Sequence, residues 1–158
     1  MTKLPADIAN PTIFGGRILI GPFSDALKDH LSTMRADFQS FDNAGTAVMP
    51  YIAAWHEDDK TIWYEYVSRG LLTLLDCTSD QAAEVFRDSI LERHVYKEID
   101  PETDVDVLHK EAIFDARPQL RKEVKMRGAV EAVYKMQRAE GEIVWLKDQA
   151  SIQCFEQD

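Results

Sequence analysis

Long apolar runs are missing from this sequence of 158 residues. A helix that spans a membrane needs about 20 consecutive apolar residues. The stretch Ile13–Ile20 is interrupted by Arg17 and has glycines close by, so it matches neither a membrane span nor the apolar part of a secretory signal. We therefore expect no membrane insertion and a cytoplasmic protein.

Cysteine is also scarce. Cys77 and Cys154 stand far apart and match no metal or redox spacing, which predicts reduced thiols in an intracellular protein. The four histidines form no pair spaced for zinc. The sequence has no glycine-flanked nucleophilic serine, no glycine-rich phosphate loop and no Cys–His signature. We therefore expect no metal site, no catalytic residues and no enzymatic activity.

Positive charge is in the minority, with 18 basic against 28 acidic residues and a net charge of −10. Binding to nucleic acid needs clustered Lys and Arg, and here the basic residues are scattered. Their one local concentration, within residues 121–127, also contains Glu123 and is interpreted as a solvated face. We expect no nucleic-acid partner.

The 45% hydrophobic content is enough for one core, and three segments are expected: an irregular arm (1–22), an amphipathic helix (23–46) and one globular domain (47–158). In the arm, Arg17–Ile20 could add a short strand. The helix carries apolar residues at spacings of 4, 3, 4 and 3, which is an a/d alternation over two heptads. Such a stripe either pairs with a second copy or packs on the domain's own sheet. Its members are Leu27, Leu31, Met34, Phe38 and Phe41.

After this helix, the pattern predicts a β-hairpin made of Met49–Trp55 and Thr61–Val67. Two short apolar helices follow, at 71–75 and 78–86, and the second has a capping-box pair in Thr78 and Gln81.

The middle of the chain is harder to assign. Residues 89–99 give no clear signal. Asp100-Pro101 predicts the start of a longer helix with a buried stripe of Val105, Leu108 and Ala112, ended by Pro118. Residues 119–128 are left without an assignment.

The last third predicts two strands, Val130–Arg138 and Ile143–Phe155, joined by a turn at Glu140-Gly141. Alternation places the even positions of the second strand in the core and Trp145 on the opposite face. We expect the heptad helix to cover that face or to pair with its copy. Asp148 breaks the apolar set of even positions.

Three stretches resemble the PAS family of sensory domains, over about residues 47–156. Residues 64–68 with the leucines at 72, 74 and 75 are similar to its second strand and the helix after it. Ile99–Asp104 is similar to the loop that opens its longest helix, and Tyr134–Trp145 to its charged hairpin. The resemblance implies an α+β fold with an antiparallel sheet of about five strands and short helices on one face.

The resemblance further implies a regulatory homodimer that controls an output module such as a histidine kinase or diguanylate cyclase. The expected dimerisation residues are the heptad stripe and Trp145. A small ligand in the core would lie near His109, with His94, Tyr66 and Tyr96 as further lining. Some members bind heme through a helical histidine, but we favour a hydrogen-bonded structural role for His109.

A flavin is not expected, because the family's Asn-Cys-Arg context is absent. Two departures from the family pattern stand out. A further strand is expected after Phe155, so either the chain is a fragment or Arg17–Ile20 fills that position in the sheet. Residues 119–128 are longer than the usual connection.

Two other functions remain open. An enzyme of the ketosteroid-isomerase or dehydratase kind, with an α+β cone fold, would need a general base in an apolar pocket, and only His109 or Asp148 could serve. Its helices would precede most strands, whereas here a hairpin precedes them. The third possibility is a protein-docking module with a filled core.

Overall fold

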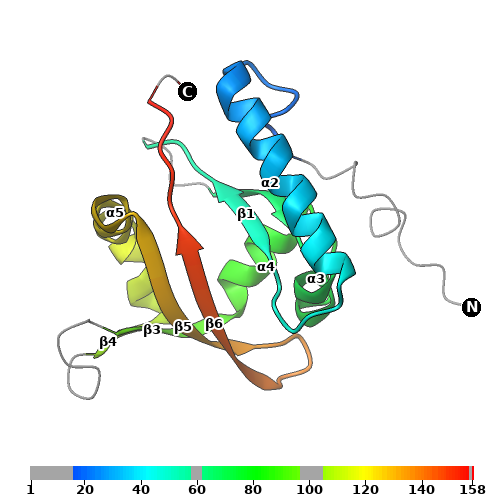
Figure 1. The fold of residues 1–158 in the computed structure, drawn as a ribbon. Coiled ribbons are helices and arrows are strands. Elements are labelled where there is room, and N and C mark those ends of the chain that lie inside the picture. The colour runs from blue at the N-terminus through cyan, green and yellow to red at the C-terminus, as the bar shows by residue number, and fades with distance from the viewer. Residues whose placement is uncertain (1–15, 58–61, 97–104, 157) are drawn as a thin grey trace, which may run out of the picture. The chain divides into compact units, whose positions relative to one another are not determined.

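The computed structural model describes residues 16–57, 62–96, 105–156 and 158 (Figure 1). The fold is α+β, with four helices and six strands in this part of the chain. The strands form two antiparallel sheets, one of two strands and one of four, instead of the single sheet of about five strands that was expected. The chain divides into two compact units, Met1–Phe86 with Phe155–Asp158, and Arg87–Cys154.

The first unit contains the expected amphipathic helix, α2 (Asp25–Asn43). Ser24 is its N-cap, in extended conformation, and its side chain accepts a hydrogen bond from the backbone N–H of Leu27. Asp25 follows in the first turn, where its carboxylate interacts favourably with the positive end of the helix dipole. This helix lies within the expected segment 23–46.

The predicted hairpin is also present. Strand β1 (Tyr51–Ala54) pairs antiparallel with β2 (Trp63–Val67). Helix α3 (Arg69–Leu75) begins after its cap Ser68 and ends at Asp76, whose φ of 52° is left-handed. The structure therefore confirms the hairpin and the first short helix.

Helix α4 (Ala82–Ser89) begins later than expected. Residues Thr78 and Gln81 nevertheless make a capping contact, because the backbone N–H of Thr78 donates to the side chain of Gln81. This contact lies in the turn that precedes the helix.

The stripe of α2 packs within the first unit. Leu31 is 3% exposed and clusters with Ile18 and Trp63, and Leu27 packs against this cluster. Further along the helix, the ring of Phe38 lies 6.2 Å from that of Tyr66. Of the two alternatives for the stripe, packing on the chain's own hairpin is therefore the one observed in this unit.

The segment before α2 forms a turn instead of the strand that Arg17–Ile20 could have added. A buried carboxylate explains this local structure. Glu65 is 0% exposed, and its Oε1 accepts hydrogen bonds from the backbone N–H groups of Arg17 (2.9 Å) and Ile18 (2.8 Å) and from Nε1 of Trp63 (2.8 Å). These backbone donors turn toward one side chain, so they cannot pair with a strand.

The second unit is built on a sheet with the strand order β4-β3-β5-β6. In chain order, its strands are β3 (Ile90–Tyr96), β4 (Val105–His109), β5 (Ala129–Gln137) and β6 (Ile143–Ser151). Residues 89–99, which had no assignment, therefore contain the strand that lies between β4 and β5. The late hairpin is confirmed, although β6 ends at Ser151 and not at Phe155.

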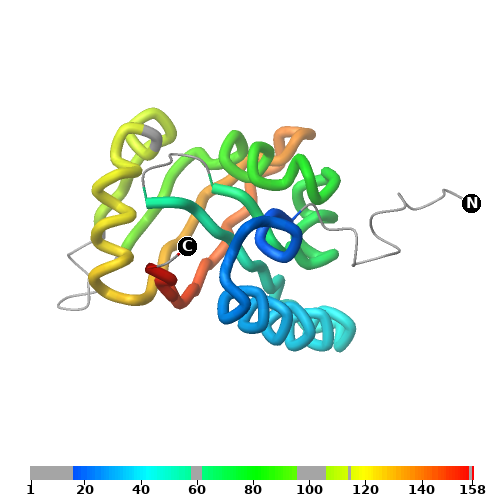
Figure 2. The backbone as a smooth tube through the Cα atoms, turned by 90° about the horizontal axis from the view of Figure 1, so that it is seen from above, coloured from blue at the N-terminus to red at the C-terminus, as the bar shows by residue number. Residues whose placement is uncertain are grey.

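The prediction of a helix that begins at Asp100 is wrong for residues 105–109, which the structure describes. Residues 105–109 are the strand β4, and the helix α5 is Lys110–Arg127 (Figure 2). The stripe of Val105, Leu108 and Ala112 is therefore divided between a strand and a helix. Its first members lie in antiparallel register with β3, and that long-range pairing overrides the helical spacing.

Pro118 does not end this helix, and the unassigned residues 119–127 are its second half. Pro118 is exposed, so its ring lies on the solvent side, and the packing of α5 on β3, β4 and β5 offsets the missing hydrogen bond. Gly128 ends the helix with a φ of 71°. Residues 100–104, with the expected cap Asp100-Pro101, lie outside the described residues.

The alternation along β6 is confirmed. Its even positions, including Asp148, are half-buried and its odd positions are exposed. The register with β5 is continuous, so no bulge changes the direction of Asp148. On β5, Ala132 and Met136 are the buried residues of the same face. Among the described helices, none is both long and apolar enough to cross a membrane.

Candidate functional site

Four side chains form a row straight across the sheet of the second unit, one from each strand. Glu92 on β3 is in register with His109 on β4 and with Lys135 on β5, and Lys135 is in register with Trp145 on β6. Residues in register lie on the same face of a sheet. His94, two residues from Glu92, shares this face. We call these five residues the polar row.

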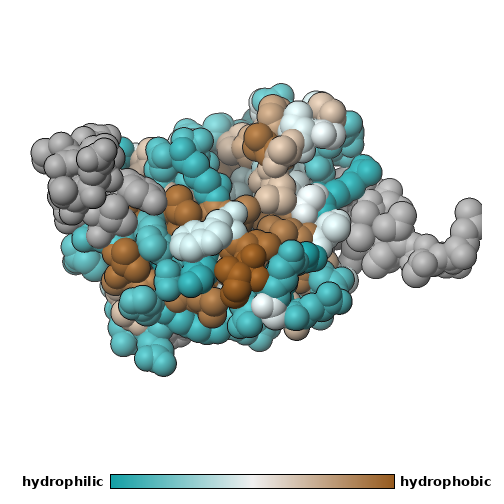
Figure 3. Space-filling model, turned by 90° about the horizontal axis from the view of Figure 1, so that it is seen from below, coloured by the Kyte–Doolittle hydropathy of each residue, from teal (hydrophilic) through white to brown (hydrophobic). Residues whose placement is uncertain are grey.

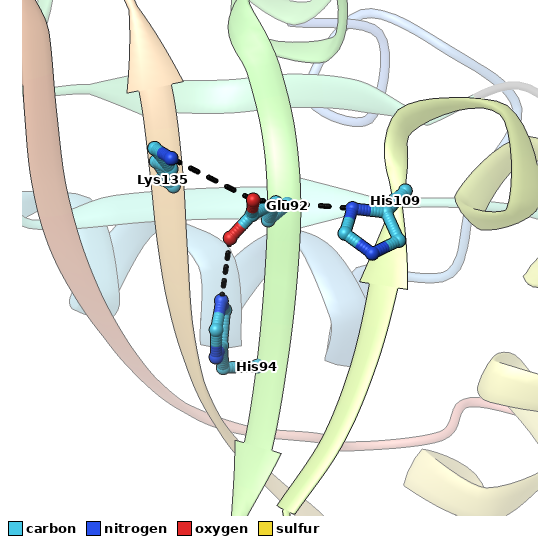
Figure 4. A network of polar contacts seen from close by, with 4 residues as sticks. All are labelled: Glu92, His94, His109 and Lys135. Carbon is cyan, nitrogen blue, oxygen red and sulfur yellow. Dashed lines mark hydrogen bonds and ion pairs between the residues drawn. The ribbon is translucent and has the colours of Figure 1, made fainter.

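Glu92 is the centre of the polar row (Figure 4). Its Oε2 lies 2.9 Å from Nε2 of His94, and its Oε1 lies 3.6 Å from Nζ of Lys135 and 3.9 Å from Nδ1 of His109. The side chains of Glu92 and His94 are 23% and 18% exposed, whereas that of His109 is 75% exposed. The carboxylate is therefore surrounded by three basic groups at the edge of solvent.

These neighbours hold the pKa of Glu92 below its usual value. The hydrogen bond with His94 is the main cause, and the charges of Lys135 and His109 add to it. Glu92 is consequently ionised at neutral pH and fixes the orientation of His94 and Lys135.

The indole of Trp145 closes the row at β6. It is 57% exposed. The ring of His94 meets it edge-on, with centroids 5.4 Å apart, and Nζ of Lys135 lies 5.8 Å from its centroid. The indole is therefore held in a defined position by neighbours on its own sheet while much of its surface faces solvent.

The sequence predicted two of the five residues as ligand contacts. His94 and His109 do lie together, but at the surface and not in a core. Tyr66 lies in the other unit, where it is buried and its hydroxyl donates to Oδ2 of Asp42 at 3.1 Å. Burial and this carboxylate raise the pKa of Tyr66 to about 12. Tyr96 is the last residue of β3, and its side chain is not among those that the structure describes.

The prediction that His109 lies on the face of a helix is wrong. It is the last residue of β4 and the N-cap position of α5, and its side chain makes no capping bond. A heme ligand needs an imidazole that points into an apolar pocket, and an imidazole that is 75% exposed does not meet that requirement. Among the described residues, no group of three or more His, Cys, Asp or Glu could hold a metal ion.

Glu92 and Lys135 were missed by the sequence analysis. Glu92 and His94 alternate along one strand, and this spacing could have indicated a shared face. Residues 89–99 give no clear secondary-structure signal, so the sequence alone does not indicate a strand there. Lys135 could be found only through the register of β3 with β5, which joins residues 43 positions apart.

The opposite face of the sheet carries a second group of polar residues. Arg93 is buried and in register with Tyr134, and the charges of Arg93 and Asp148 act on that phenol. Burial raises the pKa of Tyr134, with Asp148 adding to the effect and Arg93 opposing it. Asp148 and His109, the two possible bases of an isomerase, therefore lie on opposite faces of the sheet.

Comparisons with protein-family models, with curated proteins and with solved structures found no match.

The lowered pKa of Glu92 predicts a pH dependence of stability. A carboxylate whose pKa is lower in the folded than in the unfolded state adds stability above its unfolded value, near 4.5, and this contribution is lost as the pH falls through the folded value. Glu92→Gln should therefore be less stable than the wild type at pH 7, and the difference should shrink below about pH 4. Urea unfolding at several pH values measures it. The control is Glu140→Gln, in the exposed turn. A difference that stays constant from pH 7 to pH 3 would contradict the prediction.

Proposed function

We propose that this chain is a sensor and dimerisation domain of the PAS type, which regulates an attached or partner output module such as a histidine kinase or diguanylate cyclase. Two copies pair through the sheet face that carries the polar row. The domain itself performs no catalysis. A signal acts by changing the relative stability of two states of this pair, for which it must contact the two states differently.

The order of elements supports the proposal. A hairpin (β1–β2) is followed by two short helices, later by the long helix α5, and finally by an antiparallel pair (β5–β6), which is the order that the resemblance implies. The strands β3 and β4 are additional to that order. They form the part of the sheet on which His94, Glu92 and His109 lie.

The observation that carries the proposal is the exposure of Trp145. An indole that is 57% exposed on an ordered strand is typical of a binding surface, where tryptophan often supplies much of the affinity. Apolar residues of the same face are also exposed: Val107 (41%), in register with His94, and Ile143 (43%), two residues before Trp145. Figure 3 shows apolar side chains exposed among hydrophilic ones on one side of the molecule.

A second copy is the partner that this face favours, because the face carries both signs of charge. Glu92 lies between His109 and Lys135, and nearby Lys147 pairs with Glu131 at 2.8 Å. A face with alternating charges can be complementary to itself across a two-fold axis. A face of one sign would instead repel its copy.

Sedimentation velocity tests the proposal. Trp145→Ala should weaken the dimer by about 30-fold, which corresponds to the loss of a central aromatic contact. The control is Met126→Ala, which removes a side chain that is 88% exposed at the end of α5, outside the sheet. It should leave the dimer unchanged. A Trp145→Ala protein that dimerises as the wild type does would remove this face from the interface.

A further inference from the structure

The start of α2 is held by the last residues of the chain. Oδ1 of Asp158 accepts the backbone N–H of Ser24 at 2.6 Å, and Oδ2 accepts the Ser24 hydroxyl at 2.6 Å. Six residues after Ser24, the ring of His30 lies 5.7 Å from that of Phe155. Residues separated by more than 120 positions in the sequence thus contact each other within the first unit. We call the contacts of Phe155 and Asp158 with α2 the exit latch.

The geometry at Ser24 makes the latch part of the helix cap. The Ser24 hydroxyl donates its proton to Asp158, which directs its oxygen lone pairs toward the N–H of Leu27, 3.2 Å away. The carboxylate also adds negative charge at the positive end of the helix dipole, where hydrogen bonds to a charged acceptor are strong. Removal of Asp158 should therefore loosen the cap that Ser24 provides.

The other end of the latch is joined to the strand that carries Trp145. Strand β6 ends at Ser151, and the backbone N–H of Ile152 still donates to the carbonyl of Gly128 at 2.8 Å. The latch begins three residues later, at Phe155.

We propose that the exit latch makes the start of α2 and the residues Phe155 and Asp158 one switch element, so that the two dock and release together. When the latch is docked, Asp158 holds the Ser24 side chain in place and the first turn of α2 is hydrogen-bonded to its cap. When the latch is released, Ser24 loses its charged acceptor and the first turn frays. The use of this switch in signalling rests on the proposed function, but its existence depends only on contacts within the first unit.

Reciprocal effects of two variants test the switch. Asp158→Ala leaves the Ser24 hydroxyl in place, and it should raise the hydrogen-exchange rate of the Leu27 amide by at least about tenfold, which is the effect expected from one lost charge-assisted bond. Ser24→Ala changes only the helix, and it should increase the mobility of a spin label on Cys154, which is exposed and precedes Phe155. The label is attached in a Cys77→Ser background.

Glu156→Ala, an exposed neighbour of Phe155, is the matched control and should change neither signal. If Asp158→Ala leaves the Leu27 amide unchanged, or if Ser24→Ala leaves the label unchanged, the two ends are not coupled and the proposal is wrong. Both measurements are made in the Trp145→Ala background as well. Failure of dimerisation would leave the result of this test unaffected.

Discussion

Leu31→Ala should lower the free energy of unfolding by about 3 kcal/mol, which is among the largest effects expected for this chain. Leu31 is 3% exposed in a cluster with Ile18 and Trp63, so truncation leaves a cavity between α2 and the hairpin. Loss of buried apolar surface and the cavity both destabilise the folded state. Urea unfolding followed by circular dichroism measures the change.

The control for this prediction lies on the same helix and in the same heptad pattern. Phe41 is 44% exposed, and Phe41→Ala should cost less than about 1 kcal/mol. If both variants lost the same free energy of unfolding, the burial of Leu31 and the exposure of Phe41 in the structure would be contradicted. In particular, a loss at Phe41 that grows with protein concentration would indicate that this end of the stripe pairs with a second copy.

Glu65→Ala should cost on the order of 3 kcal/mol or more, because it leaves buried donors without an acceptor. The backbone N–H groups of Arg17 and Ile18 and Nε1 of Trp63 all donate to one oxygen of this side chain. The fluorescence of Trp63 should shift as its indole N–H loses this partner. Thermal unfolding monitored by tryptophan fluorescence records both effects.

Glu65→Gln separates hydrogen bonding from charge. The amide oxygen can replace Oε1 as the acceptor, so most of the stability should return. The position of Oε2 is more restricted: within the described part of the chain it has no hydrogen-bond partner, and a Cβ on Gly16 would lie 1.9 Å from it. Gly16→Ala should therefore displace the Glu65 carboxylate from this position. If Glu65→Gln were as destabilising as Glu65→Ala, the account based on the three donors would be wrong.

Elements formed by local signals were predictable from the sequence. The heptad spacing of α2, the leucine-rich α3 and the alternation of β6 each depend on residues close together in the chain. The hairpin β1–β2 likewise follows from two β-rich runs around a polar turn. In each case local propensity agrees with the tertiary contacts.

The polar row could not be predicted in the same way, because it depends on register. Its residues come from four strands, and residues 89–99, which contain β3, give no clear signal in the sequence. Two local signals were misleading: the stripe that begins at Val105, and Pro118, which normally ends a helix. Long-range pairing of β3 with β4 and packing of α5 overrode both. His94 and His109 were selected as pocket residues, but only the fold shows that Glu92 joins them at the surface.

The central claim is that Trp145 lies in the interface between two copies of this chain. The most direct measurement is the indole N–H spectrum of the 15N-labelled protein in a dilution series, because Trp63 supplies an internal reference: its Nε1 donates to the buried Glu65. We predict that the signal of Trp145, assigned with Trp145→Ala, shifts on dilution while that of Trp63 stays constant. A Trp145 signal that is independent of concentration, in a protein whose sedimentation shows a dimer that dissociates over the same range, would contradict the account.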